Sequence, residues 1–114
     1  MLRRVGGAVG PRSAHEPSAY AERVLEVVAQ VPAGRVMTYG DVREWLGESS
    51  PRAVGVVLAH HGHDVPWWRV VLADGRPAPV GRERALARLA AEGVPVEDGR
   101  VDLAAARWDG RPPA

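Results

Sequence analysis

The chain of 114 residues is long enough for one domain with a core and too short for two. Its composition, 46% hydrophobic and 25% charged, is typical of soluble globular proteins, and no apolar run approaches the roughly 20 residues needed to cross a bilayer. No secretory signal is visible near the N-terminus, so we expect a cytoplasmic protein without a membrane anchor.

Cysteine is absent, which excludes disulfide bonds, thiolate metal sites and a thiol nucleophile. The net charge of +1 is a weak indication of nucleic-acid binding, because such binding needs basic groups gathered on one face. All 15 basic residues are arginine, a bias typical of a high-GC genome. The number of arginines therefore does not by itself indicate a function.

Residues 1–17 are rich in Gly, Arg, Ser and Pro and have no apolar period, which predicts a flexible N-terminal arm. Its arginines could contact phosphates, but a disordered terminus is the favoured interpretation. Ser18 can then cap a helix with Tyr20, Val24 and Val28 on its apolar face, which ends before Pro32. This segment is predicted to be a core helix.

Two capped helices follow in close succession. Residues 38–41 (Thr-Tyr-Gly-Asp) resemble a capping box that opens a helix with Val42, Trp45 and Leu46 on one face, and Gly47 ends it. Ser50 and a proline at the first helical position begin a second helix that extends to about His60. The pair forms a helix-turn-helix pattern, in which the second helix approaches DNA, although the pattern alone is common.

A polar loop, residues 60–64, and a pair of adjacent tryptophans come next. The histidines of the loop lack the spacing of known zinc motifs, so no metal site is predicted. Trp67 and Trp68 are difficult to bury together, because neighbouring side chains of an extended segment point to opposite faces. One of them is expected to line a site, while the alternative is a buried edge strand with one core tryptophan. Residues 68–72 are predicted to be extended.

The remaining elements complete the predicted fold. Asp74 and Gly75 predict a turn, residues 81–92 a helix ended by Gly93, and residues 94–96 and 100–103 a small hairpin. The fold class is mainly α with short β elements, a winged helix-turn-helix over residues 18–108 followed by a tail over 109–114. The arginines of the last helix (Arg82, Arg84 and Arg88) are predicted to form a solvated face.

Three motifs, in order, resemble those of the O6-alkylguanine-DNA alkyltransferases. They are residues 38–41, residues 52–55 (Arg-Ala-Val-Gly) and residues 66–71 (Pro-Trp-Trp-Arg-Val-Val), the last followed by Asp-Gly. Trp67 stands where the acceptor cysteine of that family would be, and Trp68 where its histidine would be. This substitution resembles the alkyltransferase-like proteins, which bind alkylated DNA without repairing it.

The resemblance implies a role for each matched residue. Arg52 would enter the duplex through the minor groove and fill the gap left by a flipped nucleotide. Trp67 and Val70 would offer main-chain carbonyls to the guanine amine. Whether Arg76 or His61 contacts the lesion is left open. The implied DNA contacts are Tyr39, Ser50, Arg52, Ala53, Gly55 and Arg69, and the implied alkylguanine pocket is Tyr39, Leu58, Pro66, Trp67, Val70 and Arg76.

The resulting hypothesis is non-enzymatic recognition of DNA damage. The protein would bind and flip O6-alkylguanine without a cofactor or a metal, act as a monomer on double-stranded DNA, and mark the lesion for nucleotide excision repair proteins. One alternative is a winged-helix regulator that reads a specific DNA sequence. Another is a protein-interaction module that does not bind DNA. A true alkyltransferase is excluded by the lack of cysteine.

Overall fold

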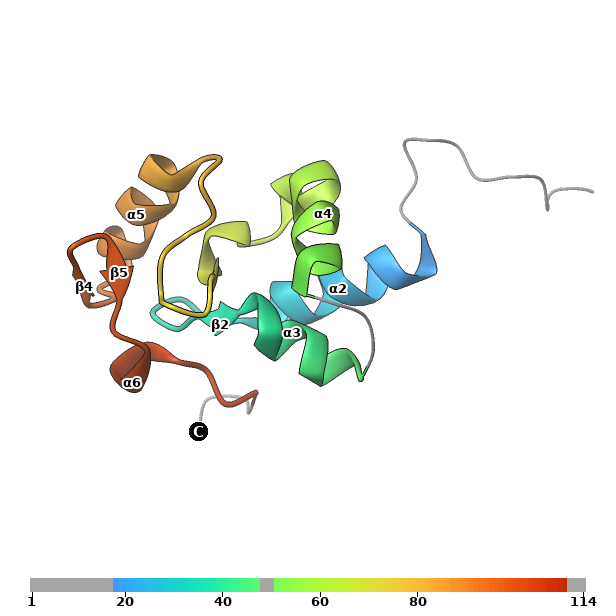
Figure 1. Ribbon diagram of the computed structural model, residues 1–114, viewed down its shortest axis with the longest axis horizontal. Coiled ribbons are helices and arrows are strands. Elements are labelled where there is room, and N and C mark those ends of the chain that lie inside the picture. The colour runs from blue at the N-terminus through green and yellow to red at the C-terminus, as the bar shows by residue number, and fades with distance from the viewer. Residues whose placement is uncertain (1–17, 48–50, 111–114) are drawn as a thin grey trace, which may run out of the picture.

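A helix-turn-helix unit and a smaller helix-and-hairpin unit meet at a short pair of parallel strands in the computed structural model, which describes residues 18–47 and 51–110 (Figure 1). No helix in these two ranges is long and apolar enough to cross a membrane. In chain order the elements are α2 (Ala19–Gln30), β2 (Met37–Thr38), α3 (Tyr39–Leu46), α4 (Pro51–His61), η1 (Gly62–Asp64), η2 (Trp67–Arg69), β3 (Val70–Val71), α5 (Arg82–Ala91), β4 (Val96–Glu97), β5 (Arg100–Val101) and α6 (Leu103–Ala106).

The first two helices begin and end where their local chemistry predicts. The Ser18 hydroxyl accepts a hydrogen bond of 3.1 Å from the amide of Ala21 at the start of α2. At the start of α3, Thr38 Oγ1 accepts from the amide of Asp41 at 2.9 Å, and Asp41 Oδ2 accepts from the amide of Thr38 at 3.1 Å. Gly47 ends α3 in the left-handed conformation (φ +80°), so the predicted capping box and stop are confirmed.

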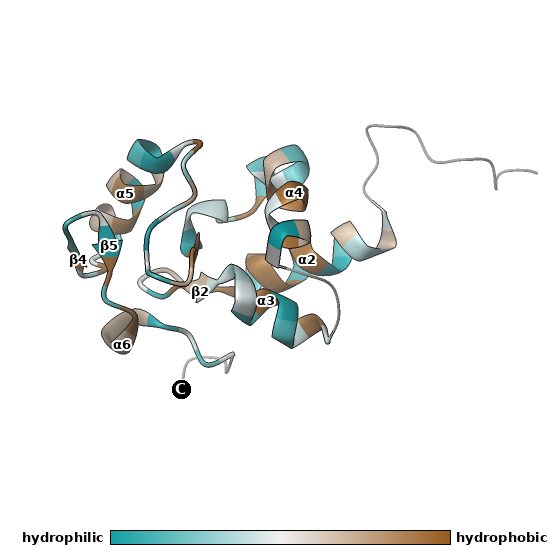
Figure 2. Ribbon diagram, in the orientation of Figure 1, coloured by the Kyte–Doolittle hydropathy of each residue, from teal (hydrophilic) through white to brown (hydrophobic). Residues whose placement is uncertain are grey.

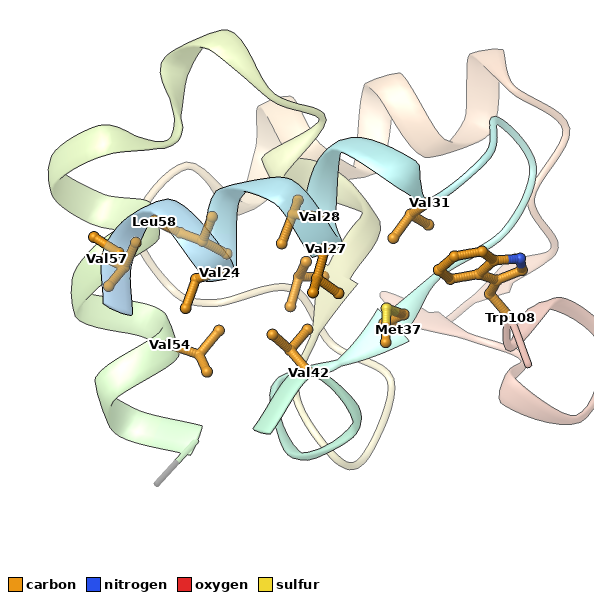
Figure 3. Packing of buried hydrophobic residues seen from close by; sticks show 12 residues of the cluster. Val24, Val27, Val28, Val31, Met37, Val42, Val54, Val57, Leu58 and Trp108 are labelled. Carbon is orange, nitrogen blue, oxygen red and sulfur yellow. The ribbon is translucent and has the colours of Figure 1, made fainter. Parts of the chain in front are cut away.

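The main core lies between α2, α3 and α4. Figure 3 shows its valines and Leu58 around α2, with Met37 and Trp108 at one end. A second cluster packs α5 and the hairpin against the centre of the chain, and its buried members are Val36, Val71, Leu89, Val94, Val101 and Ala106. The hydropathy colouring places apolar residues on the inward sides of α2 and α4 (Figure 2). Full burial of one such side chain contributes about 1.5–3 kcal/mol, so these two clusters hold the fold together.

A parallel pairing of β2 with β3 brings the helix-turn-helix beside the tryptophans. Its register aligns Met37 with Val70 and Thr38 with Val71. Both strands are fully buried, and α3 begins directly after β2. Tyr39, the first residue of α3, is therefore placed next to the segment that carries Trp67.

The tryptophan pair is not extended as predicted. Trp67–Arg69 form the 3-10 turn η2, closed by a 3.0 Å hydrogen bond from the amide of Arg69 to the carbonyl of Pro66. Only Val70–Val71 find a partner strand, so the residues before them satisfy their backbone groups locally. As a result the rings of Trp67 and Trp68 meet edge to face, with centroids 5.8 Å apart, instead of pointing to opposite faces.

The C-terminal part contains the predicted hairpin and one helix that was not predicted. β4 and β5 pair antiparallel through a two-residue loop in which both Asp98 (φ +54°) and Gly99 (φ +76°) are left-handed, as a type I′ turn requires. The prediction that residues 100–103 all belong to the hairpin is wrong. Asp102 instead caps α6, its carboxylate accepting a 3.3 Å hydrogen bond from the amide of Ala105.

Candidate nucleic-acid interface

An apolar pocket of about 120 Å³ opens between α4, η2 and α5. We call it the inner pocket. It is much larger than the roughly 10–15 Å³ that a single water occupies. Helices α3 and α4 contribute one wall, η2 and β3 the floor, and the loop before α5 the opposite wall. Its lining residues are Tyr39, Gly55, Leu58, Ala59, Trp67, Trp68, Val70, Pro77, Ala78, Val80 and Ala85.

A wider, shallower groove of about 400 Å³ adjoins the inner pocket and leads to Arg52. We call it the outer groove. It shares Tyr39, Gly55, Ala59 and Ala78 with the inner pocket and adds Arg52, Val56 and Leu72. Arg52 is exposed at the second position of α4 and makes no ion pair within the described parts of the chain. A cationic side chain at a helix start, beside an apolar groove, is suited to approach a nucleic acid.

Tyr39 contributes an aromatic ring and a hydroxyl to both cavities. Burial raises the pKa of its phenol above the ordinary value. The hydroxyl therefore stays protonated at neutral pH and can donate a hydrogen bond to a phosphate or a base. Tyr39 therefore lines both cavities, and its contact with DNA or with alkylguanine stays a prediction.

Gly55 has no internal packing reason to lack a side chain. A Cβ at this position would meet its nearest non-helical neighbour, Tyr39 Cε1, at 3.9 Å, which is ordinary van der Waals contact. Glycine within a helix costs roughly 1 kcal/mol relative to alanine. Because Gly55 lines both cavities, the missing side chain keeps the space between α4 and an incoming ligand open.

Three arginine guanidinium groups lie over the two tryptophan rings. The Arg84 Cζ is 5.2 Å from the Trp67 centroid, and Arg88 and Arg69 lie 4.5 Å and 5.2 Å from the Trp68 centroid. Such cation–π contacts are each worth about 0.5–2 kcal/mol, depending on exposure. Arg84 and Arg88 are exposed, as predicted for a solvated arginine face on α5, and their guanidinium groups also lie over the aromatic floor of the pocket.

Glu92 connects the tryptophan turn to the rest of the fold. Its carboxylate accepts 2.9 Å from the Trp68 indole Nε1 and 2.6 Å from Arg69 Nη2, and it also accepts from the amide of Gly34. Burial raises the pKa of Glu92, but the hydrogen bonds from Arg69 and Trp68 outweigh it and hold the pKa below its usual value. Glu92 is thus ionised at neutral pH and fixes the orientation of Trp68.

Arg69 is not placed to contact DNA as the sequence predicted. Its side chain is only 16% exposed, it pairs with Glu92, and its Nη1 donates a 2.9 Å hydrogen bond to the carbonyl of Val31. If the Arg69 guanidinium turned outward toward a phosphate, it would leave the largely buried carboxylate of Glu92 without its ion-pair partner. The geometry assigns Arg69 to the support of η2 and argues against a phosphate contact.

Other predicted site residues also lie away from the inner pocket. Pro66 precedes η2 and does not line either cavity, and His61 ends α4 outside both. Arg76 pairs with Asp74 at 2.7 Å across the exposed turn. Ser50 lies outside the described residues. No cluster of potential metal ligands is present in residues 18–47 and 51–110.

Leu58, Trp67 and Val70 line the inner pocket, and their role in binding alkylguanine stays a prediction. The Trp67 carbonyl already accepts a hydrogen bond from the amide of Val70, which leaves it one further lone pair for a ligand. Sequence reasoning missed the opposite wall, formed by Pro77, Ala78, Val80 and Ala85. Pro77, Ala78 and Val80 lie in a proline-containing loop and Ala85 lies on α5, and none of them has a local signal that would assign it to a pocket.

Comparison with known proteins identifies the family. Residues 19–94 match the family described as 6-O-methylguanine DNA methyltransferase, DNA binding domain. The chain belongs to this family. Among its relatives, the DNA base-flipping protein of Escherichia coli (strain K12) is 42% identical over 98 residues, which cover 79% of this chain and 74% of that protein. Alkyltransferase-like protein 1 of Schizosaccharomyces pombe is 35% identical over 81 residues, covering 65% and 75% respectively.

A solved family structure also has the same fold. The crystal structure of S. pombe Atl1 in complex with damaged DNA containing O6-carboxymethylguanine superposes with a TM-score of 0.71 at 28% sequence identity. The match covers 79% of this chain and 94% of that chain. The winged helix-turn-helix prediction and the resemblance to the alkyltransferase-like proteins are both confirmed.

Proposed function

We propose that this protein recognises O6-alkylguanine in double-stranded DNA and holds it without chemical change. The observation that carries this proposal is the inner pocket, which has the aromatic floor of Trp67 and Trp68 and opens through the outer groove onto Arg52. The base would leave the duplex and enter the inner pocket, while Arg52 would occupy the vacated position in the stack.

The energetics favour a damaged base over a normal one. Extrusion costs a few kcal/mol and is least costly for a base whose pairing is already weakened. Stacking on an aromatic side chain returns on the order of 1–3 kcal/mol per base. Normal guanine keeps its full pairing in the duplex, so its extrusion costs more. The net free energy of binding it in the same pocket is therefore less favourable.

No transfer of the alkyl group is expected. The chain has no cysteine, and an indole at position 67 cannot accept an alkyl group as a thiolate does. The relatives named as a DNA base-flipping protein and an alkyltransferase-like protein support a role in damage recognition without catalysis.

The decisive experiment is a binding titration with matched duplexes that differ by one O6-methyl group. We expect tighter binding to the methylated duplex whatever the flanking sequence. A preference for one DNA sequence regardless of methylation would instead identify a sequence-specific regulator, and no binding to either duplex would identify a protein-interaction module.

We also propose that a monomer forms this complex and that nucleotide excision repair proteins then take over the lesion. The support is the resemblance to the alkyltransferase-like proteins, together with the lack of a cysteine that could remove the alkyl group from the base. A repair assay that compares excision of methylated guanine with and without this protein tests the second part. A cytoplasmic location remains a prediction.

A further inference from the structure

A second groove, of about 430 Å³, lies between α3 and the C-terminal segment. We call it the acidic groove. It is lined by Met37, Asp41, Glu44, Trp45, Arg107, Trp108, Asp109 and Gly110. In Figure 1 this C-terminal segment runs along the lower edge of the molecule, whereas α4 and α5 rise at the upper edge. Among the described residues, the acidic groove shares no lining residue with the inner pocket or the outer groove.

Helix α3 separates the two sites by its geometry. Tyr39 faces the inner pocket, and Asp41 lies two residues further along, about 200° around a helix of 3.6 residues per turn. Glu44 and Trp45 then follow Asp41 on its side of α3, and all three line the acidic groove. A ligand can therefore occupy the acidic groove while DNA occupies the other face.

Trp45 is the anchor of the acidic groove. The described residues include three large apolar side chains that are clearly exposed, and two of them, Val56 and Val80, line the nucleic-acid site. The third is Trp45, which is 49% exposed. Its ring stacks on Trp108 at 6.1 Å with an interplanar angle of 22°.

The backbone at Gly110 packs closely against the ring of Trp45. A Cβ on Gly110, which has φ +86°, would collide with the ring of Trp45. The Trp45 ring is stacked on Trp108 on one face and is partly exposed to solvent, which we call its open face. An aromatic side chain that is already packed in this way loses little conformational entropy on binding, which is typical of interface hot spots.

The charges around Trp45 define what fits there. Among the described residues, the charged side chains that line the acidic groove are Asp41, Glu44, Arg107 and Asp109. Arg107 is paired with Asp41 through Nε at 2.9 Å and Nη2 at 2.5 Å. Glu44 is exposed beside Trp45 in the same groove, so an arginine side chain can stack on Trp45 and pair with Glu44, whereas a DNA phosphate would meet the like charge of Glu44.

We propose that the acidic groove binds an arginine-bearing segment of a partner protein while the lesion site holds DNA. The arginine lies flat on the open face of Trp45, with its guanidinium directed toward Glu44, and the residues beside it contact Met37 and Trp108. The proposal does not depend on which DNA lesion is recognised, because the two sites use different residues.

The test uses a capped pentapeptide, acetyl-Gly-Pro-Arg-Pro-Gly-amide, and the same peptide with neutral citrulline in place of arginine. Titration into ¹⁵N-labelled protein is followed through the four tryptophan indole N–H signals. We expect saturable shifts of Trp45 and Trp108 with the arginine peptide, weaker binding of the citrulline peptide, and no shift of Trp67 or Trp68. The same affinity is expected when the methylated duplex is present.

Two variants test whether the peptide binds through Trp45 and Glu44. Trp45→Ala should reduce peptide affinity about tenfold, and Glu44→Gln, an exposed change that leaves the fold intact, should reduce it severalfold. Arg52→Ala on the opposite face should have no effect. Equal binding of the two peptides, unchanged affinity in Trp45→Ala and Glu44→Gln, or self-association of the protein through Trp45 in a diffusion measurement would overturn the proposal. Failure of lesion binding with intact peptide binding would leave it standing and refute the proposed function instead.

Discussion

Replacement of Glu92 by glutamine tests whether the floor of the inner pocket depends on a buried ion pair. Glu92 and Arg69 are 15% and 16% exposed, and the carboxylate also accepts from the Trp68 indole and the amide of Gly34. Glutamine removes the charge and retains one carbonyl oxygen for three donor groups. Arg69 is then left nearly buried without a counter-charge.

The cost follows from this geometry. Breaking a buried ion pair by removing one partner costs about 3–5 kcal/mol, and the residual exposure of both groups places Glu92→Gln near 3 kcal/mol. For a domain of this size, each kcal/mol shifts Tm by roughly 4–8 °C, so a loss of about 3 kcal/mol should lower Tm by roughly 12–24 °C. Because Trp68 loses its anchor, binding of methylated DNA should also weaken more than binding of unmodified DNA.

The pH dependence gives a second readout. The folded-state pKa of Glu92 lies below its usual value, so its contribution to stability is present above the unfolded pKa of about 4.3 and is lost as pH falls through the folded pKa. The stability difference between the native protein and Glu92→Gln should therefore be constant above about pH 5 and shrink as the pH falls below the unfolded pKa of about 4.3. Calorimetric unfolding at several pH values measures this. Glu26→Gln, an exposed change on α2, is the matched control. A loss under 1 kcal/mol that is abolished by salt would refute the reasoning, because only surface pairs behave in that way.

Four further outcomes are expected at the nucleic-acid site. Gly55→Ala should stabilise the fold by about 0.5–1 kcal/mol in thermal unfolding and yet weaken lesion binding, because the added methyl group narrows both cavities without a clash. Arg52→Ala should leave Tm unchanged and abolish the fluorescence rise of a base analogue beside methylated guanine, whereas a phosphate-only role would reduce the salt slope by about one unit on every duplex. Trp67→Ala should weaken binding to methylated DNA more than to unmodified DNA in parallel titrations, and equal losses with a large fall in Tm would indicate a core role. Trp67→Cys should form no methylated adduct by mass spectrometry, because Trp68 cannot activate a thiol as a histidine does.

Sequence reasoning succeeded where the determining interaction is local. The capping box of Thr38 and Asp41 and the stop at Gly47 each depend on residues within a few positions. Such signals act through a hydrogen bond or a φ value that one short segment controls. The helix-turn-helix pattern follows from these signals.

Interactions between distant segments were not predictable in the same way. The parallel register of Met37 with Val70 and the hydrogen bond between Trp68 and Glu92 join residues far apart in the chain. Nothing in the sequence near Arg69 distinguishes a guanidinium that turns inward from one that faces DNA. Its role follows only from the position of Glu92 at the end of α5, which the packing of α5 against η2 determines.

The contacts that fix the Trp68 ring suit a site that binds a base and does not react with it. An enzyme gains rate only from interactions that are stronger in the transition state than in the ground state, so tight binding of the unreacted base would be of no use to it. A protein that only recognises a lesion needs the opposite, since its whole effect is the stability of the ground-state complex. A floor held by Glu92, Arg84 and Arg88 loses little entropy when a base stacks on it, and this lowers the cost of binding. At position 68 an anchored indole therefore offers a binding surface and no proton carrier, which suits the proposed recognition of a lesion without chemistry.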